Sequence, residues 1–444
     1  MNIGVIFGVG AFIMGLLIAV PIGWLFIGAT GLGLAVSGIP ANFIMGTFYH
    51  ALNSDVLMAI GFFVFAGSLI SEGGLADKIV AFSQILVGRI RGGLVLVGIV
   101  ATIFMSALTG SSIPCISALI PLLVPRLEKL GYKREYVTAV LCSSSFLGYL
   151  IPPSLPALVY CLLAQQSVAA VFLSTVIPGL ILAVGYAVLN YFISDRYCDK
   201  EVLAKSPGLL PFKERVRILP KVSQEALPAL GCPLVILVGI YGGLCTPNEA
   251  GALASVYCIL VGFFVYRKLN RKTMSSALAV SVISIGVIGL MIAAGTLFGR
   301  FLVRTGTAQM FAAFLLGIFE SKAMIMFSMN VLFLIMGMFI EATPILLLGV
   351  PLILPLVSNL DVNLVHLGAI LIVNVGLGVI TPPFAMSIFV GSRLAGVSYQ
   401  KLVSPMLWYL FLVGIPVLML TTYIPALSCW LPSVLLDPRV VGPW

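Results

Sequence analysis

Two short polar segments interrupt long apolar sequence and carry oxygen atoms that could bind a small ion. The first segment divides the apolar run that begins at Leu94, and it consists of Thr109, Gly110, Ser111 and Ser112. The second lies inside the apolar stretch 324–358, and it consists of Glu341, Ala342 and Thr343. Hydroxyl, carboxylate and carbonyl oxygens are hard ligands, which suit a small alkali cation.

A proline pair follows each polar segment at the same distance. Proline removes a backbone donor and frees carbonyl groups that an unbroken helix would use. We therefore place one Na+ site between the first segment and the residues before Pro152 and Pro153, which are Ser143, Ser144, Ser145 and Gly148. A pseudo-symmetric site is expected between the second segment and the residues before Pro382 and Pro383, which are Asn374, Gly376, Gly378 and Thr381. The alternative is that the prolines only kink helices and the serines bond to their own helix.

The elements that position these residues must be membrane helices. The chain has 444 residues, of which 61% are hydrophobic and 9% charged, with a mean hydropathy of +1.18. At about 20 apolar residues per span, it has room for roughly ten to twelve transmembrane helices. Stretches such as 235–240 are apolar on every side, which excludes the alternation of a β-barrel. We predict an all-α polytopic membrane protein, and exclude a soluble enzyme, a single-pass receptor and a DNA-binding factor.

The net charge of +9 arises from short basic clusters between apolar spans, which indicates topology and not nucleic-acid binding. The polar stretch 195–226 divides the chain into a first half, 1–194, and a second half, 227–444, and we expect it to be a cytoplasmic linker. The eight cysteines contain no CxxC pair, so no disulfide framework or zinc site is predicted. The N-terminus lacks a basic leader, and we interpret it as a retained first helix.

The two halves contain an internal repeat. When 114–153 is compared with 344–383 at a constant offset of 230, all five prolines of each window coincide, and eleven of forty positions are identical. Such self-similarity at one fixed offset indicates duplicated structure. We therefore predict two repeats, each containing a hairpin and a broken helix.

The basic residues give the repeats opposite orientations. The loop after Pro125 contains Arg126, Lys129, Lys133 and Arg134, whereas the corresponding loop after Pro355 contains no Lys or Arg. By the positive-inside rule the first loop is cytoplasmic and the second is external. Arg89 and Arg91 place the start of the first hairpin on the cytoplasmic side as well, so this hairpin must re-enter the membrane.

The expected boundaries follow from this pattern. The hairpins should span about 94–125 and 324–358, and the broken helices about 136–165 and 364–390. Inverted repeats of this kind are the architecture of secondary transporters that alternate access around a site at the middle of the membrane.

A carboxylate in the middle of the membrane is energetically costly and is usually functional. Glu341 is therefore the single residue that most strongly indicates a functional site. Its alternative is a structural ion pair with a basic neighbour. We predict a substrate site formed by Ser111, Ser154, Arg300, Arg304 and Glu341. The two arginines end an apolar run, so they could instead extend to the membrane interface. We assign no role to His50 or His366.

These motifs resemble the large membrane subunit of a tripartite ATP-independent periplasmic (TRAP) transporter. The resemblance rests on the tip GSS, the break GYLIPPS, the loop RLEKLGY and the pattern VNVGLGVITPP, and it covers nearly the whole chain. It implies a Na+-driven elevator in the bacterial inner membrane that imports a small organic anion such as a C4-dicarboxylate, sialic acid or a sugar acid. It also implies two partners, a small four-helix membrane subunit, which we expect not to be fused here, and a periplasmic substrate-binding protein.

Two positions depart from the family pattern. Cys115 stands where family members commonly have an Asp, and Gly61 where they commonly have a Pro. The sequence therefore leaves the anion open, together with the number of Na+ ions and the oligomeric state.

Other functions remain as alternatives. A stand-alone Na+/dicarboxylate symporter would need no binding protein. A membrane enzyme would need a nucleophile with a base or a metal set, and a channel would need a continuous pore. No GxxxxGK[ST] motif is present, which argues against ATP-driven transport by this chain.

Overall fold

The regular secondary structure in the described part of the chain consists of helices. The computed structural model describes residues 3–40, 42–87, 93–199 and 212–444, and within them no strand occurs beyond an isolated bridge between Tyr132 and Cys198. Nine helical segments in these ranges are long and apolar enough to cross a membrane, and shorter apolar helices adjoin them. This confirms the prediction of an all-α polytopic protein.

The first half supplies the helices up to the linker. Its elements are α1 (Ile3–Leu17), α2 (Ile22–Ser37), α3 (Asn42–Leu52), α4 (Asp55–Glu72), α5 (Leu75–Val87), α6 (Gly93–Thr109), α7 (Ser112–Lys129), α8 (Arg134–Ser144), α9 (Leu147–Leu150), α10 (Leu155–Ala164) and α11 (Val168–Ile193). The helices α6 and α7 form the expected hairpin sequence, and α8, α9 and α10 form the segment interrupted before the proline pair. Arg89 and Arg91 lie outside the described residues.

The second half begins within the stretch that we expected to be a linker. Its elements are α13 (Phe212–Tyr241), α14 (Pro247–Leu260), α15 (Arg271–Arg304), α16 (Thr307–Ile318), α17 (Lys322–Phe339), α18 (Ala342–Asn359), α19 (Leu364–Gly378), α20 (Met386–Ala395), α21 (Tyr399–Tyr409), α22 (Ile415–Tyr423), α23 (Ala426–Leu435) and α24 (Pro438–Val441). The linker residues from Phe212 are thus helical and continue into an apolar segment, while residues 200–211 lie outside the described ranges.

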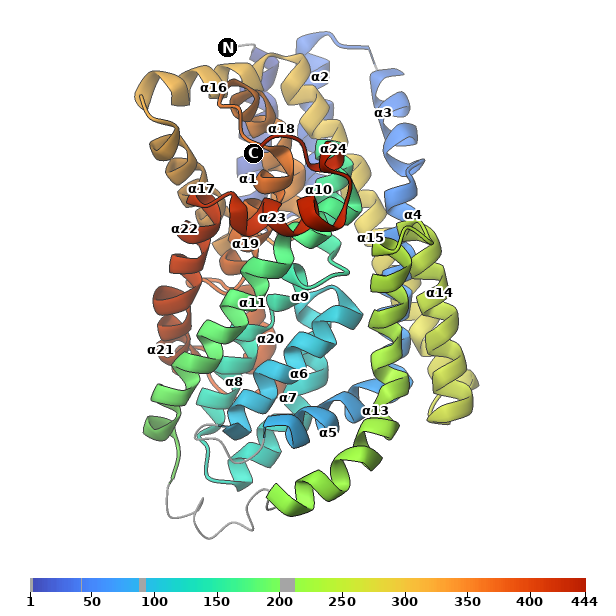
Figure 1. The fold of residues 1–444 in the computed structure, drawn as a ribbon. Helices are drawn as coiled ribbons and strands as arrows, with labels where there is room; N and C mark the ends of the chain where they lie inside the picture. Colours follow the sequence, from blue (N-terminus) through green and yellow to red (C-terminus); the bar gives the residue numbers. More distant parts are fainter. Residues whose placement is uncertain (1–2, 41, 88–92, 200–211) are drawn as a thin grey trace.

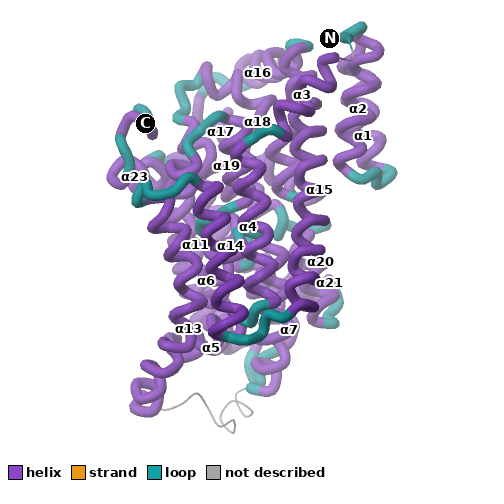
Figure 2. The backbone as a smooth tube through the Cα atoms, turned by 90° about the vertical axis from the view of Figure 1, so that its right-hand side faces the viewer, coloured by secondary structure: helices purple, strands orange, loops and turns teal. Residues whose placement is uncertain are grey.

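The two hairpins lie toward opposite ends of the molecule. Figure 1 shows α6 and α7 in the lower half, near α5 and the start of α13, and α17 and α18 in the upper half, near both termini. Figure 2 shows that long helices such as α11 and α15 run along the long dimension. At 1.5 Å per residue α15, with 34 residues, is about 51 Å long and exceeds the thickness of a bilayer core.

Helices of the first half pack on helices of the second half in reciprocal pairs. The helix α10 of the first half packs on α18 of the second, and α20 of the second half packs on α7 of the first. In the same way α11 packs on α19, and α21 packs on α8. Two-fold related repeats would produce this reciprocal pattern, and it places α7, α18 and both broken helices in one packed unit.

Local sequence explains where several helices begin. Ser154 follows the proline pair, adopts an extended backbone and accepts a hydrogen bond from the Ala157 N–H at 3.3 Å, so α10 starts with an N-cap. Thr246 and Glu249 form a reciprocal capping box at the start of α14. Both proline pairs contain a cis peptide bond, between Pro152 and Pro153 and between Pro382 and Pro383.

Candidate functional site

The first tip is seated directly on the first broken helix. Gly110 has a φ of +61°, and a Cβ atom there would lie 2.6 Å from the carbonyl oxygen of Pro153. The Leu155 N–H donates a hydrogen bond of 3.1 Å to the Gly110 carbonyl. Glycine is therefore required at this position for two reasons, its backbone conformation and the close approach of the proline pair.

Gly148 brings the other side of the break against the same tip. A Cβ atom on Gly148 would lie 2.7 Å from the Ser111 carbonyl oxygen. The backbone of the tip and the backbone of the broken helix are thus in contact. Backbone carbonyls at a helix break can serve as cation ligands in membrane transporters.

A cluster of three serine hydroxyls lies at this contact. The Oγ of Ser112 is 2.6 Å from the Oγ of Ser145 and 3.1 Å from the Oγ of Ser387, and all three side chains are buried. Ser112 and Ser145 are predicted site residues that the structure brings together. Ser387 was missed, because the offset of 230 pairs it with Ala157 and so gives no repeat signal.

The remaining predicted residues of the first site divide into two groups. Ser144 donates to the Val140 carbonyl and contacts the Thr102 hydroxyl, and Thr109 donates to the Met105 carbonyl. Both hydroxyls therefore bond to their own helix, which is the structural alternative to a Na+ site. The Oγ of Ser143, by contrast, is buried and has no hydrogen-bond partner in the described part of the chain. A buried polar atom without a partner requires an explanation such as an ion or water.

In the second half, Asn374 lies against the body of the hairpin. Its Nδ2 donates to the backbone oxygen of Asn330 at 2.9 Å and to the Oδ1 of Asn330 at 3.0 Å. The Asn374 Oδ1 is buried and has no partner among the described residues. This acceptor oxygen is available to a cation.

The other second-site residues pack more tightly than the sequence suggested. A Cβ on Gly378 would lie 2.5 Å from the Cα of Gly337 in α17, and a Cβ on Gly376 would lie 2.7 Å from the Phe146 ring. Thr381 donates back to the Leu377 carbonyl at 2.6 Å. Gly376 and Gly378 therefore permit close helix packing. Asn374 carries the buried acceptor oxygen, Oδ1, that has no partner among the described residues.

A cavity of about 460 Å³ joins the two tips. Ser111 lines it from the first tip, the second tip contributes Glu341, Ala342 and Thr343, and α4 and α15 close the other side. The helices α7 and α18 both begin at this cavity, with Ser111 and Glu341 at their N-cap positions. Neither N-cap side chain bonds to its own helix, so the N-cap side chains do not occupy the first N–H groups of these helices.

The predicted substrate residues do not share one cavity. Ser111 and Glu341 line the tip cavity, where Glu72 is the one further charged residue among those that the structure describes, whereas Arg300 and Arg304 line a separate cavity. Ser154 is buried and caps α10. Within the described ranges, the residues that line the tip cavity thus include two carboxylates and no basic side chain.

Comparisons with known proteins agree with this architecture. The profile of the family described as "Tripartite ATP-independent periplasmic transporter, DctM component" matches residues 9–427. The sialic acid TRAP transporter large permease protein SiaM of Vibrio cholerae is 31% identical, over 95% of this chain and 97% of that protein. The C4-dicarboxylate TRAP transporter large permease protein DctM of the same organism is 32% identical, over 87% of each chain.

Two further similarities concern a longer relative and a solved structure. The isethionate TRAP transporter permease protein DctMQ of Oleidesulfovibrio alaskensis is 31% identical over 94% of this chain, which spans 65% of that protein. The structure of the YdaH transporter of Alcanivorax borkumensis matches with a TM-score of 0.59 at 16% identity, over 90% of this chain and 89% of that one. At this identity the second match shows the fold alone.

Proposed function

Because the chain belongs to the family of DctM components of TRAP transporters, we propose that it imports a small organic anion across the bacterial inner membrane together with Na+. In this proposal it is a permease subunit, as its relatives are named, and it performs no chemistry on its cargo. The observation that carries the proposal is the meeting of two helix N-termini, those of α7 and α18, at one cavity between the two tips.

The helix termini explain how an anion could bind without a basic side chain. Each α-helix carries a partial positive charge at its N-terminus, and its first N–H groups can bind a carboxylate or sulfonate. A cavity of about 460 Å³ has room for such a group and a short carbon skeleton. The relatives are named for a C4-dicarboxylate, sialic acid and isethionate, which all carry one of these two groups.

Na+ supplies the positive charge that the cavity lacks. An anion beside Glu341 and Glu72 would place like charges together in one cavity, which is unfavourable. The hydroxyls of Ser112, Ser145 and Ser387 offer one set of oxygen ligands, and the Oδ1 of Asn374 offers an acceptor in the second half. We propose that cargo Na+ binds at these two places and thereby makes anion binding favourable.

An elevator motion is compatible with the packing of α15 on the second hairpin. A Cβ on Gly295 would lie 2.7 Å from the Leu347 side chain, and a Cβ on Gly299 would lie 2.7 Å from Pro351. Small residues at this contact give α15 a smooth surface, which would let α18 shift past it. The unit that contains both hairpins would then carry the cargo against α4 and α15.

Two partner proteins complete the proposed system. We propose that a periplasmic binding protein delivers the anion and that a small membrane subunit covers part of the apolar surface. The large exposed side chains of Trp24, Phe264 and Phe411 support this, because such apolar surface is expected to face lipid or another membrane helix.

Reconstitution tests this function. The chain is placed in proteoliposomes with the small subunit and binding protein of its gene neighbourhood, and uptake of succinate, N-acetylneuraminate and isethionate is measured with and without an inward Na+ gradient. We expect one acid to accumulate only with both the gradient and the binding protein. Uptake that persists without the binding protein would favour a stand-alone symporter, and uptake that ignores Na+ would contradict coupling.

A further inference from the structure

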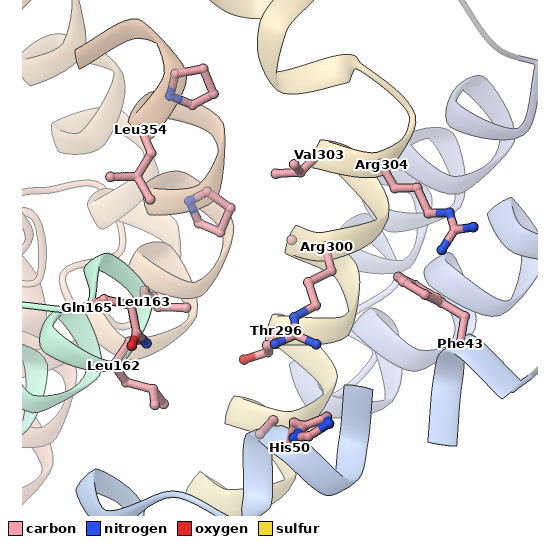
Figure 3. A pocket seen from close by; sticks show the side chains of 14 residues that line it. Phe43, His50, Leu162, Leu163, Gln165, Thr296, Arg300, Val303, Arg304 and Leu354 are labelled. Carbon is pink, nitrogen blue, oxygen red and sulfur yellow. The ribbon is translucent and has the colours of Figure 1, made fainter. Parts of the chain in front are cut away.

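A cavity that the proposed transport cycle leaves unused lies near the C-terminal end of α15. Its volume is about 760 Å³, and Figure 3 shows that α3 and α15 form one wall while α10 and α18 form the other. We call it the vestibule. Its lining includes Thr296, Arg300 and Arg304 from α15, together with His50 from α3.

The vestibule lies on the side of the membrane opposite the basic clusters. The cluster 267–272 extends into the first turn of α15, and the positive-inside rule places it in the cytoplasm. Ile288 lines the tip cavity and Arg300 lines the vestibule, and their separation of twelve residues corresponds to about 18 Å along the helix. The vestibule is therefore on the external approach to the tip cavity.

A close helix contact separates the two cavities. Gly295 meets Leu347 between Met291, the last α15 residue of the tip cavity, and Thr296, the first of the vestibule. A solute in the vestibule would thus face a packed wall formed by α15 and α18. Movement of α18 along α15 would change this wall.

The vestibule has the opposite charge character from the tip cavity. Its lining contains two arginines and no carboxylate, and in the described part of the chain neither arginine forms an ion pair. The Arg304 guanidinium lies over the Phe43 ring, 5.1 Å from its centroid, which leaves Arg300 as the arginine not held by an aromatic ring. Figure 3 shows the Arg300 side chain extending toward Thr296, and the Arg304 side chain turned toward Phe43.

A second observation points to a ligand at the same place. The Oγ1 of Thr296 is buried and has no hydrogen-bond partner among the described residues. It lines the vestibule one helical turn from Arg300. A guanidinium and a hydroxyl on one helix face form a donor set that matches a carboxylate or sulfonate.

We propose that the vestibule is a second anion site, in which Arg300 and Thr296 hold the carboxylate or sulfonate of the cargo before it reaches the tip cavity. This inference rests on the proposed function. The arginine attracts the anion after the binding protein releases it. A phospholipid headgroup is the other anion that an arginine at this depth could meet.

Site-directed labelling tests the proposal without requiring transport. Val303 lines the vestibule, and Val303→Cys is introduced with Cys198→Ser and Cys245→Ser, because the other six cysteines are buried. The rate of alkylation by neutral N-ethylmaleimide is then measured in detergent with succinate, N-acetylneuraminate or isethionate. We expect the acid that the unmodified chain transports to slow alkylation.

Matched variants test whether Arg300 is responsible for the protection from alkylation. Arg300→Gln should remove the protection and Arg300→Lys should retain part of it. Arg439→Gln, at an exposed arginine outside the cavity, should leave the protection unchanged. Protection that survives Arg300→Gln, or an absence of protection by an acid that is transported, would overturn the proposal.

Two controls separate the possible causes of failure. Protection by phosphatidylglycerol in nanodiscs, with none by the acids, would identify a lipid site and overturn the cargo proposal. Uptake by the unmodified chain is measured in parallel: if no acid is transported the proposed function fails, whereas transport without protection rejects the vestibule site alone.

Discussion

The hydroxyl oxygens of Ser112 and Ser387 lie 3.1 Å apart, although 275 residues separate them in the chain. Ser112 opens the second helix of the first hairpin, and Ser387 lies just after the second proline pair. This contact joins the two halves at the proposed Na+ site. Opening either half at this point would therefore disturb ion binding.

Replacement of Ser387 tests the cluster. Ser387→Ala should raise the Na+ concentration for half-maximal uptake about tenfold, because one of three hydroxyl ligands is lost and such a ligand contributes about 1.5 kcal/mol. Na+ dependence of uptake in proteoliposomes gives the value. Ser174→Ala is the control, since Ser174 is equally buried but bonds only to the Val171 carbonyl, and its Na+ dependence should not change.

The amide of Asn374 gives a second test. Asn374→Ala removes the unpartnered Oδ1 and the amide that donates to the Asn330 carbonyl, so Na+ should no longer stabilise the protein and uptake should be lost. The melting temperature in detergent, with and without Na+, measures this. Asn363→Ala, in the N-cap of the same helix, should cost about 1 kcal/mol of stability yet keep the Na+-dependent shift. A normal Na+ shift in Asn374→Ala would show that this residue is structural.

The carboxylate of Glu341 should act on the cargo more than on Na+. Glu341→Gln keeps the shape of the side chain but removes from the tip cavity the charge that repels the bound anion. Because the anion should then leave more slowly, we expect the maximal uptake rate to fall at least about tenfold, which corresponds to about 1.4 kcal/mol. The half-maximal Na+ concentration should change less than it does in Ser387→Ala. Glu249→Gln, in an exposed capping box, should transport normally. Equal loss in the two variants would refute a specific role for Glu341.

Close packing at the second break predicts an effect on stability. Gly378→Ala places a Cβ within 2.5 Å of the Gly337 backbone and should destabilise the protein by about 1–3 kcal/mol. Gly286→Ala in α15 has open space around the new methyl group, so it should be neutral or slightly stabilising. Thermal unfolding of the two variants in detergent compares them, and equal melting temperatures would contradict the tight contact.

The proline spacing predicts where the helices of each half are interrupted. The predicted tips 109–112 and 341–343 fall where α6 ends and α7 begins, and where α17 ends and α18 begins. Prolines and glycines at fixed spacing act locally on the backbone, so a sequence reveals them directly. The helical continuation of the linker from Phe212 was not expected, because its polar composition resembles a loop.

Side-chain partners depended on packing that no local pattern records. Ser387 has no counterpart in the repeat. Ser111 and Glu341 line one cavity and Arg300 and Arg304 line another, and this separation depends on where α15 crosses the hairpins. Likewise, Asn374 meets Asn330 because α19 packs along α17. Such contacts follow from the crossing of helices far apart in the chain.

The most direct test of Na+-coupled uptake is to measure both fluxes in the same proteoliposomes. Labelled acid and ²²Na+ are followed together in the complete system, with Ser387→Ala alongside the unmodified chain. The account predicts that addition of acid-loaded binding protein starts Na+ entry, and that the Na+ concentration needed for both fluxes rises in the variant. Accumulation of acid without accompanying Na+ entry would contradict it.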